Sequence, residues 1–290
     1  MENFEIAIME NFENMRGPVL DKLVEVITML GEETIMLVLV IALWFAFDKK
    51  LAQKFFFVTA LSLNANGVIK NIVKRPRPWA VGDITCLRPE TATGYSFPSG
   101  HTQTFSTWSS AAAKCIKRIS VWITVIILIL AVACSRIYLG AHYPSDVIVG
   151  AVLGISFGIF GSVLFDKVAN KKKLYLISAA VVTPFAVFFL LQAELLYEDF
   201  FKVYGMLIGL PLAVSIEEKY APLDYTVVWW KKVLRILIGL VLALAVKEVL
   251  KLVDVFGITE LSLIIHGVRY FALAVTVLGL APILFKKCKM

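Results

Sequence analysis

One pair of residues in this sequence combines a nucleophile with a group able to orient it. His142 and Asp146 stand four residues apart, where Pro144 favours the start of a helix. At that spacing the carboxylate can accept the imidazole Nδ1–H, which fixes the tautomer and leaves Nε2 able to attack an electrophile. The plainer interpretation is a surface histidine beside a helix-capping aspartate. Ser135 and Arg136 precede the pair and add a hydroxyl and a guanidinium.

A second stretch predicts an anion site at the start of a helix. Pro98, Ser99 and Gly100 open a helical run and are followed directly by His101. A helix start of this kind presents unpaired backbone N–H groups and the positive end of the helix dipole. His101 then lies in the first turn, beside the anion. An ordinary helix cap with an interfacial histidine is the plainer interpretation.

A third stretch ends a helix with cations. Lys70 is followed by Arg75-Pro76 and Arg77-Pro78, and each proline disfavours helical geometry in the residue before it. The stretch therefore predicts a helix end that carries several positive charges. Taken alone, it is explained by interfacial cations that extend toward lipid head groups.

Together the three stretches hold two histidines, an orienting aspartate, several cations and a helix N-terminus. A phosphoryl group requires this set, because it needs guanidinium and backbone N–H donors, a nucleophile and an acid. The sequence holds no acidic cluster that would bind Mg²⁺, so we expect neither a metal nor another cofactor. The combination predicts phosphoryl transfer.

The same stretches resemble the three signatures of the type 2 phosphatidic acid phosphatase family, which are K-x6-R-P, P-S-G-H and S-R-x5-H-x3-D. Lys70 with Arg77-Pro78 fits the first signature, Pro98–His101 the second and Ser135–Asp146 the third. No defining position is mismatched, and the motifs follow one another in the family's order.

The resemblance covers residues 70–146, about a quarter of the chain. Arg75-Pro76 does not fit the first signature, because the residue seven positions earlier is Val68 rather than lysine. Many relatives end near six spans, so the predicted helices in 174–290 are a departure that leaves the substrate open. The family also includes glucose-6-phosphatase-like enzymes and soluble vanadate haloperoxidases, and the composition excludes the latter.

The resemblance implies a role for each matched residue. His142 attacks phosphorus to give a phosphohistidine, Asp146 orients it, and His101 protonates the leaving oxygen and then activates water. The implied ligands of the phosphate oxygens are Lys70, Arg77, Ser99, Gly100 and Arg136.

The composition indicates how these stretches are held. The 290 residues are 59% hydrophobic and 18% charged, with a mean hydropathy of +0.80, which exceeds what one soluble core requires. The net charge of +7 does not indicate nucleic acid, because most lysines and arginines form short clusters between apolar runs. We therefore expect an all-α polytopic membrane protein with no nucleic-acid partner.

About twenty apolar residues cross a bilayer as a helix, fewer where neighbouring helices cover the ends. Nine runs qualify, and they predict spans at 33–48, 53–70, 100–116, 119–138, 145–165, 174–193, 200–216, 233–253 and 261–285. Residues 18–31 place apolar side chains at helical spacing opposite charged ones, which predicts a helix in the membrane interface.

Charge alternates between successive predicted loops. Lysine clusters lie at 49–54, 114–118, 167–173, 219–232 and 286–289, and acidic residues lie at 2–13, 194–199 and 254–260. Because basic loops remain in the cytoplasm, we expect the N-terminus outside, the C-terminus in the cytoplasm and all three motifs at the extracytoplasmic face. The loop at 70–99 breaks the alternation with five cations, which we attribute to anion binding.

We expect three regions: an interfacial segment at 1–32, a phosphatase core at 33–166 and additional membrane helices at 167–290. The expected function is a metal-independent phosphatase acting on a membrane lipid, such as phosphatidic acid, phosphatidylglycerol phosphate or a polyprenyl diphosphate. A phosphatase for a soluble sugar phosphate and a lipid-to-lipid phosphotransferase are the alternatives within this chemistry. A non-catalytic lipid-binding or transport protein is the alternative outside it, and the oligomeric state is left open.

Glycines recur at every fourth position of the predicted span at 145–165, as Gly150, Gly154 and Gly158. Small residues at this spacing let two helices approach closely. The stripe predicts close packing within the fold, with dimerisation as the alternative.

Overall fold

The computed structural model describes residues 2–251 and 258–290, and within these ranges the chain is helical with no β-strand. The helices are α1 (Glu2–Asn14), α2 (Pro18–Met29), α3 (Glu33–Ala42), α4 (Lys49–Val73), α5 (Pro78–Val81), α6 (Gly100–Ile116), α7 (Ile119–Tyr138), α8 (Pro144–Lys167), α9 (Lys171–Gln192), α10 (Glu198–Tyr220), α11 (Trp229–Lys251), α12 (Thr259–Ala274) and α13 (Ala281–Lys287). Short π-helical turns extend α3 through Phe47 and join α12 to α13.

Each of the nine runs predicted to span the membrane contains a helix, and the all-α prediction is confirmed. Within the described residues, six helices are long and apolar enough to cross a membrane, and α2 with α3 forms a seventh candidate that is bent by 46°. The predicted span at 233–253 ends on residues 252 and 253, which lie outside the described ranges. Asp254, in the acidic loop predicted at 254–260, also lies outside them.

The difference between six and nine has a physical cause in individual helices. α6 has only 17 residues and is rich in serine and threonine, which lowers its hydropathy. α11 has Lys231 and Lys232 in its first turn and carries Arg235, Lys247 and Glu248 farther along. Length and hydropathy therefore do not assign these two helices to the bilayer by themselves.

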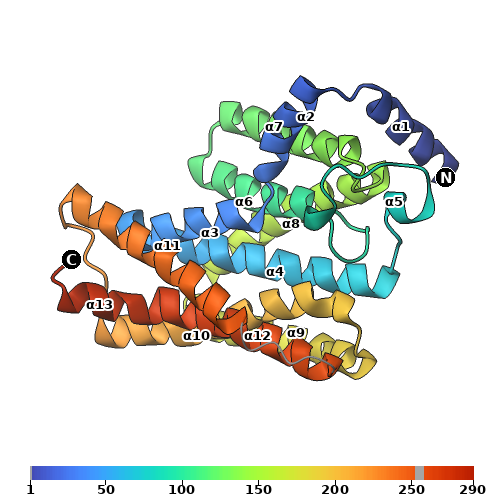
Figure 1. Ribbon diagram of the computed structural model, residues 1–290. Helices are drawn as coiled ribbons and strands as arrows, with labels where there is room; N and C mark the ends of the chain where they lie inside the picture. The colour runs from blue at the N-terminus through green and yellow to red at the C-terminus, as the bar shows by residue number, and fades with distance from the viewer. Residues whose placement is uncertain (1, 252–257) are drawn as a thin grey trace. The chain divides into compact units, whose positions relative to one another are not determined.

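The chain forms two compact units, one of residues 1–36 and 65–163 and the other of residues 37–64 and 164–290. The first unit contains all of the candidate site residues. In it α2 lies against α7, as Figure 1 shows, with Val24 packed on Tyr138 and Leu139. The sequence predicted a helix at 18–31 but not the preceding helix α1, which also contacts α7.

The glycine stripe of α8 faces α6 within the first unit. A Cβ atom on Gly154 would lie 2.5 Å from the backbone oxygen of Gln103, and one on Gly150 would lie 2.8 Å from that of Ser99. Contacts this short exclude any side chain at either glycine. The stripe therefore serves close packing inside the fold, and this packing fixes the N-terminal halves of α6 and α8 against each other.

The second unit is built around α10 and α12. A Cβ atom on Gly205 would lie 2.0 Å from the backbone oxygen of Gly267, so the two helices meet at their backbones. His266 Nε2 on α12 lies 3.2 Å from Glu198 Oε2 on α10, which adds a polar contact at one end of this pair.

Candidate active site

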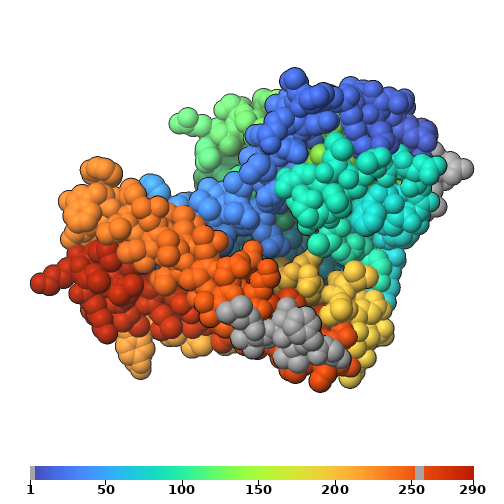
Figure 2. Space-filling model, viewed as in Figure 1, coloured from blue at the N-terminus to red at the C-terminus, as the bar shows by residue number. Residues whose placement is uncertain are grey.

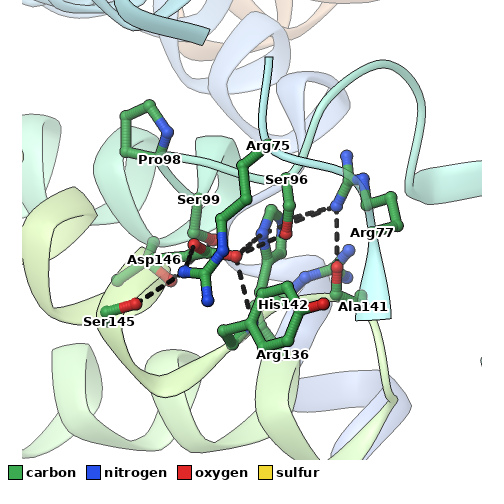
Figure 3. Close-up of polar contacts among 12 residues, drawn as sticks. Arg75, Arg77, Ser96, Pro98, Ser99, Arg136, Ala141, His142, Ser145 and Asp146 are labelled. Carbon is green, nitrogen blue, oxygen red and sulfur yellow. Dashed lines mark hydrogen bonds and ion pairs between the residues drawn. The ribbon is translucent and has the colours of Figure 1, made fainter. Parts of the chain in front are cut away.

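His142 lies between α7 and α8 and is 1% exposed. Its Nε2 is 2.9 Å from Arg77 Nη1, and its Nδ1 is 3.4 Å from Asp146 Oδ2 (Figure 3). A guanidinium can only donate, so Nε2 must carry a lone pair and Nδ1 must carry the proton. The geometry therefore holds the imidazole in the tautomer that a nucleophilic Nε2 requires.

The surroundings also keep this imidazole neutral. Burial, and then the positive charges of Arg77, Arg136 and Lys70, hold the pKa of His142 well below its usual value, although a hydrogen bond from the imidazole to the Ser96 backbone opposes this shift. A lowered pKa means that the unprotonated form persists at neutral pH. His142 is therefore available for attack without first losing a proton.

Asp146 lies in the first turn of α8 and has no exposed surface. Its Oδ1 accepts a hydrogen bond from Arg75 Nη1 at 2.9 Å. Its Oδ2 accepts from the Tyr143 N–H at 3.0 Å, from the Ser96 hydroxyl and, at the longer distance above, from His142. A buried carboxylate with this many donors is held in one orientation.

Two arginines that the sequence assigns to phosphate binding are buried beside the nucleophile. Arg77 donates to the backbone oxygens of Ala141 at 2.8 Å and Gly94 at 3.0 Å, which fixes its guanidinium next to His142. Arg136, at the end of α7, has no exposed surface and donates to the Thr28 hydroxyl at 3.0 Å. Its Nε has no hydrogen-bond partner among the described residues. The acceptors named here are neutral oxygens, which do not balance the charge of a buried guanidinium. An anionic ligand bound beside the two arginines would balance it.

The N-terminus of α6 adds backbone donors and the second histidine. Ser99 caps the helix, its N–H donates to the Asp146 backbone oxygen at 3.0 Å, and its hydroxyl lies 3.1 Å from that of Thr102. Gly100 is the first helical residue, so its N–H has no acceptor within the helix. His101 follows, and its Nε2 is buried without a hydrogen-bond partner in the described part of the chain.

α4 contributes to this helix start in two ways. Asn66 donates to the Pro98 backbone oxygen at 3.3 Å and to Gln103 Oε1 at 2.8 Å, which ties the loop before α6 to α4. Lys70 lies in the last turn of α4, and its charge acts on both His101 and His142. The three sequence stretches thus converge on one site in the first unit.

The attribution of all five cations in the loop at 70–99 to anion binding is wrong for two of them. Arg75 pairs with Glu5 at 2.7 Å as well as with Asp146. Arg88 pairs with Glu32 and Glu90, each at 3.0 Å. At least these two positive charges are balanced by carboxylates of the protein itself.

Several residues of the site were absent from the sequence prediction. Arg75 had a weak signal, since it opens the first of two Arg-Pro pairs, but the motif register excluded it. Glu5, Ser96 and Thr28 had none, because single glutamate, serine and threonine residues carry no pattern. Within residues 2–251 and 258–290 no group of three or more histidine, cysteine, aspartate or glutamate side chains is placed to hold a metal ion.

The fold and the site together define a helical membrane protein in which a buried histidine–aspartate pair lies beside buried arginines. Comparison with protein families agrees with this class. Residues 51–169 match the PAP2 superfamily, and residues 201–290 match the transmembrane extension of PAP2 superfamily phosphatases. The chain belongs to the PAP2 superfamily.

Individual relatives match over the region of the site. A decaprenylphosphoryl-5-phosphoribose phosphatase of Mycobacterium tuberculosis is 38% identical over 91 residues, which are 31% of this chain and 48% of the relative. An undecaprenyl-diphosphatase of Sulfolobus acidocaldarius is 36% identical over 118 residues, 41% of this chain and 55% of the relative. The chain thus spans about half the length of these curated relatives.

One solved structure shares the fold. The PAP2-type phosphatidylglycerolphosphate phosphatase of Bacillus subtilis superposes with a TM-score of 0.50 at 24% identity, over 58% of this chain and 88% of that one. At this identity the likeness concerns the fold alone.

Proposed function

We propose that this protein is a membrane phosphatase that removes phosphate from a lipid phosphate monoester or diphosphate through a phosphohistidine. The observation that carries the proposal is the buried His142–Asp146 pair, with Nε2 directed at the guanidinium of Arg77. A buried cation next to a neutral imidazole is suited to bring a phosphoryl group within reach of the attacking nitrogen.

In the first half-reaction His142 Nε2 forms a bond to phosphorus as the bond to the leaving oxygen breaks. His101 gives its proton to that oxygen, and the negative charge of the bound phosphate favours the protonated form of His101 beforehand. The non-bridging oxygens take donors from Lys70, Arg77, Ser99, Gly100 and Arg136. His142 keeps its Nδ1 proton, so it becomes cationic, and Asp146 stabilises that charge.

In the second half-reaction water replaces the leaving group. His101, now neutral, takes a proton from the water as its oxygen attacks phosphorus. The bond between phosphorus and His142 breaks, inorganic phosphate departs, and both histidines return to their starting protonation states.

The proposed substrate class is an amphiphilic phosphate. The relatives from Mycobacterium and Sulfolobus are named for phosphatase activity on polyprenyl-linked phosphates, which supports a lipid substrate here. A lipid-to-lipid phosphotransferase uses the same phosphohistidine with a different acceptor. A soluble sugar phosphate would fill the same phosphate site without using the membrane.

Phosphate release should distinguish these substrates. Each buried methylene of a lipid tail contributes about 0.8 kcal/mol, so a few of them raise kcat/KM by about 100-fold over a sugar phosphate. We expect detergent-purified protein to release phosphate from phosphatidic acid, phosphatidylglycerol phosphate or a polyprenyl diphosphate with at least that preference over glucose 6-phosphate. Equal or greater activity on glucose 6-phosphate would contradict the lipid assignment, and transfer to a second lipid without free phosphate would identify a transferase.

We further propose nine membrane crossings with the N-terminus outside and the C-terminus in the cytoplasm. In this topology residues 1–32 lie in the interface, 33–166 carry the chemistry, and 167–290 form additional membrane helices. The alternation of basic and acidic loops supports this orientation.

Cysteine labelling tests the orientation. In a background without Cys86, Cys115, Cys134 and Cys288, an impermeant maleimide should react with Asp83→Cys in intact cells and with Lys173→Cys only after lysis. Both positions are exposed, so access to the thiol depends on the side of the membrane. The reverse pattern would invert the topology without changing the chemistry.

A further inference from the structure

Arg75 lies between two carboxylates that come from distant parts of the chain. Its Nη1 donates to Asp146 Oδ1 at 2.9 Å and its Nη2 donates to Glu5 Oε2 at 2.7 Å. The guanidinium carbon lies 3.7 Å from the centre of the Tyr143 ring, which covers one of its faces. Its position is therefore set on three sides, and Figure 3 shows the side chain extending over Asp146.

Glu5 connects this arginine to the N-terminal helix. Its Oε1 accepts a hydrogen bond from the Ser145 N–H at 2.8 Å, so the carboxylate also caps a backbone N–H in the first turn of α8. In Figure 2 the blue N-terminal segment adjoins the teal segment that follows α4, in agreement with this contact. Although burial opposes ionisation, hydrogen bonds from Ser145 and Arg75 lower the pKa of Glu5, which keeps it charged.

The connection fixes which oxygen of Asp146 faces the nucleophile. Arg75 occupies Oδ1, while Oδ2 receives the contacts from His142, Tyr143 and Ser96. Without Arg75 the carboxylate would lose its charged donor on Oδ1 and would be held through Oδ2 alone, so rotation about its χ2 bond would be less restricted. A rotation of that kind would remove the acceptor from His142 Nδ1.

The connection also sets the local charge. With Glu5, Arg75 and Asp146 all ionised, the chain of three groups has one net negative charge. His142 gains one positive charge when it is phosphorylated, so the four groups together become neutral at that moment. Arg77, one of the cations proposed to hold phosphate, lies next to Nε2 of His142, and the negatively charged group lies next to Nδ1. The imidazole therefore stands between positive and negative charge.

We propose that Arg75 and Glu5 are positioning residues, which hold the Asp146 carboxylate in the orientation that stabilises phosphorylated His142 and so couple helix α1 to the nucleophile. The inference rests on the proposed function for its chemical meaning. It assigns to α1 a part in catalysis in addition to any contact with the membrane surface.

Kinetics separate positioning from phosphate binding. Arg75→Met should lower kcat by about 100-fold, comparable with the loss of one stabilising donor. It should leave KM within about 3-fold, because both amino groups of Arg75 are engaged by Asp146, Ser145 and Glu5. Arg75→Lys keeps the charge and should recover at least about 10-fold of that loss. The matched control is Arg88→Met in the same loop, which breaks the pairs with Glu32 and Glu90. Neither pair involves Glu5, Arg75 or Asp146, so this variant should retain kcat.

The glutamate tests the link to α1. Glu5→Gln keeps an acceptor for the Ser145 N–H but removes the negative charge, so Arg75 neutralises Asp146 more completely. We expect kcat to fall by about 10-fold. Glu13→Gln on the same helix removes the 2.7 Å ion pair with Arg16 and keeps an acceptor for the Thr85 N–H, so it should leave kcat unchanged.

A readout that does not depend on turnover is provided by ¹⁵N-histidine NMR. The chain has three histidines, so the resonances are few. Arg75→Met should shift the His142 Nδ1 resonance toward a weaker hydrogen bond and leave His266 unchanged, whereas Arg88→Met should shift neither. If wild-type protein releases no phosphate, the proposed function fails and the NMR result still decides the positioning role. Unchanged His142 resonances in Arg75→Met, unchanged kcat, or a raised KM with normal kcat would overturn the inference.

Discussion

Replacing His142 with alanine is expected to lower kcat by about 10⁴-fold or more, as removal of a catalytic nucleophile does in other enzymes. The variant loses an imidazole whose Nε2 lies against Arg77 and whose tautomer is set by Arg77 and Asp146. It should also lose the acid-labile phosphoenzyme that wild type forms with ³²P-labelled lipid. Because alanine leaves a small cavity beside Asp146, thermal unfolding must confirm that the variant is folded.

The matched control for this variant is His266→Ala in the second unit. His266 is the third histidine of the chain and pairs with Glu198 rather than with the phosphate cluster. It should keep the phosphoenzyme and most of the turnover. A His142→Ala protein that turns over at the wild-type rate, or still acquires label, would refute the assignment of the nucleophile.

Local spacing predicted the central pair of the site. His142 and Asp146 are four residues apart at a helix start, and their contact follows from that spacing alone. The glycine stripe of α8 was likewise predictable, since a four-residue repeat of glycine has few uses other than close helix packing. Features that depend on one segment of the chain were therefore accessible from the sequence.

Contacts between distant segments of the chain could not be predicted from the sequence. Arg75 and Asp146 are 71 residues apart, and Ser145 and Glu5 are 140 residues apart. No local pattern pairs such residues, because their partners are decided by how the helices pack. The motif register even directed attention from Arg75 to Arg77, although the structure gives both of them a place at the site.

The number of membrane spans stays a prediction for a different reason. Hydropathy treats each serine or threonine as a polar cost, whereas three of those in α6 bond to the backbone of their own helix. Thr107, Ser109 and Ser110 donate to the backbone oxygens four residues earlier, at 2.8, 2.6 and 2.6 Å. A helix with satisfied hydroxyls packs inside a bundle at little cost, so its polarity does not report its distance from lipid.

Replacing His101 with alanine is expected to have an effect that depends on the leaving group. For a lipid phosphate, whose alkoxide leaves poorly, loss of a general acid should lower kcat by about 10²- to 10⁴-fold. For p-nitrophenyl phosphate, whose phenolate leaves without a proton, phosphoenzyme formation should be affected far less. The buried Nε2, which lacks a hydrogen-bond partner among the described residues, is consistent with a group that acts on substrate rather than on the fold.

Burst kinetics with both substrates make this prediction specific to acid catalysis. In His101→Ala the burst with p-nitrophenyl phosphate should persist while the following steady state slows, because the same histidine activates water in the second half-reaction. Ser109→Ala is the matched control on α6, since in the described part of the chain the Ser109 hydroxyl bonds only to the Phe105 backbone oxygen. An equal loss of the first step for both substrates would show that His101 holds the phosphate instead of protonating the leaving oxygen, and the proton would then have to come from another group of the site.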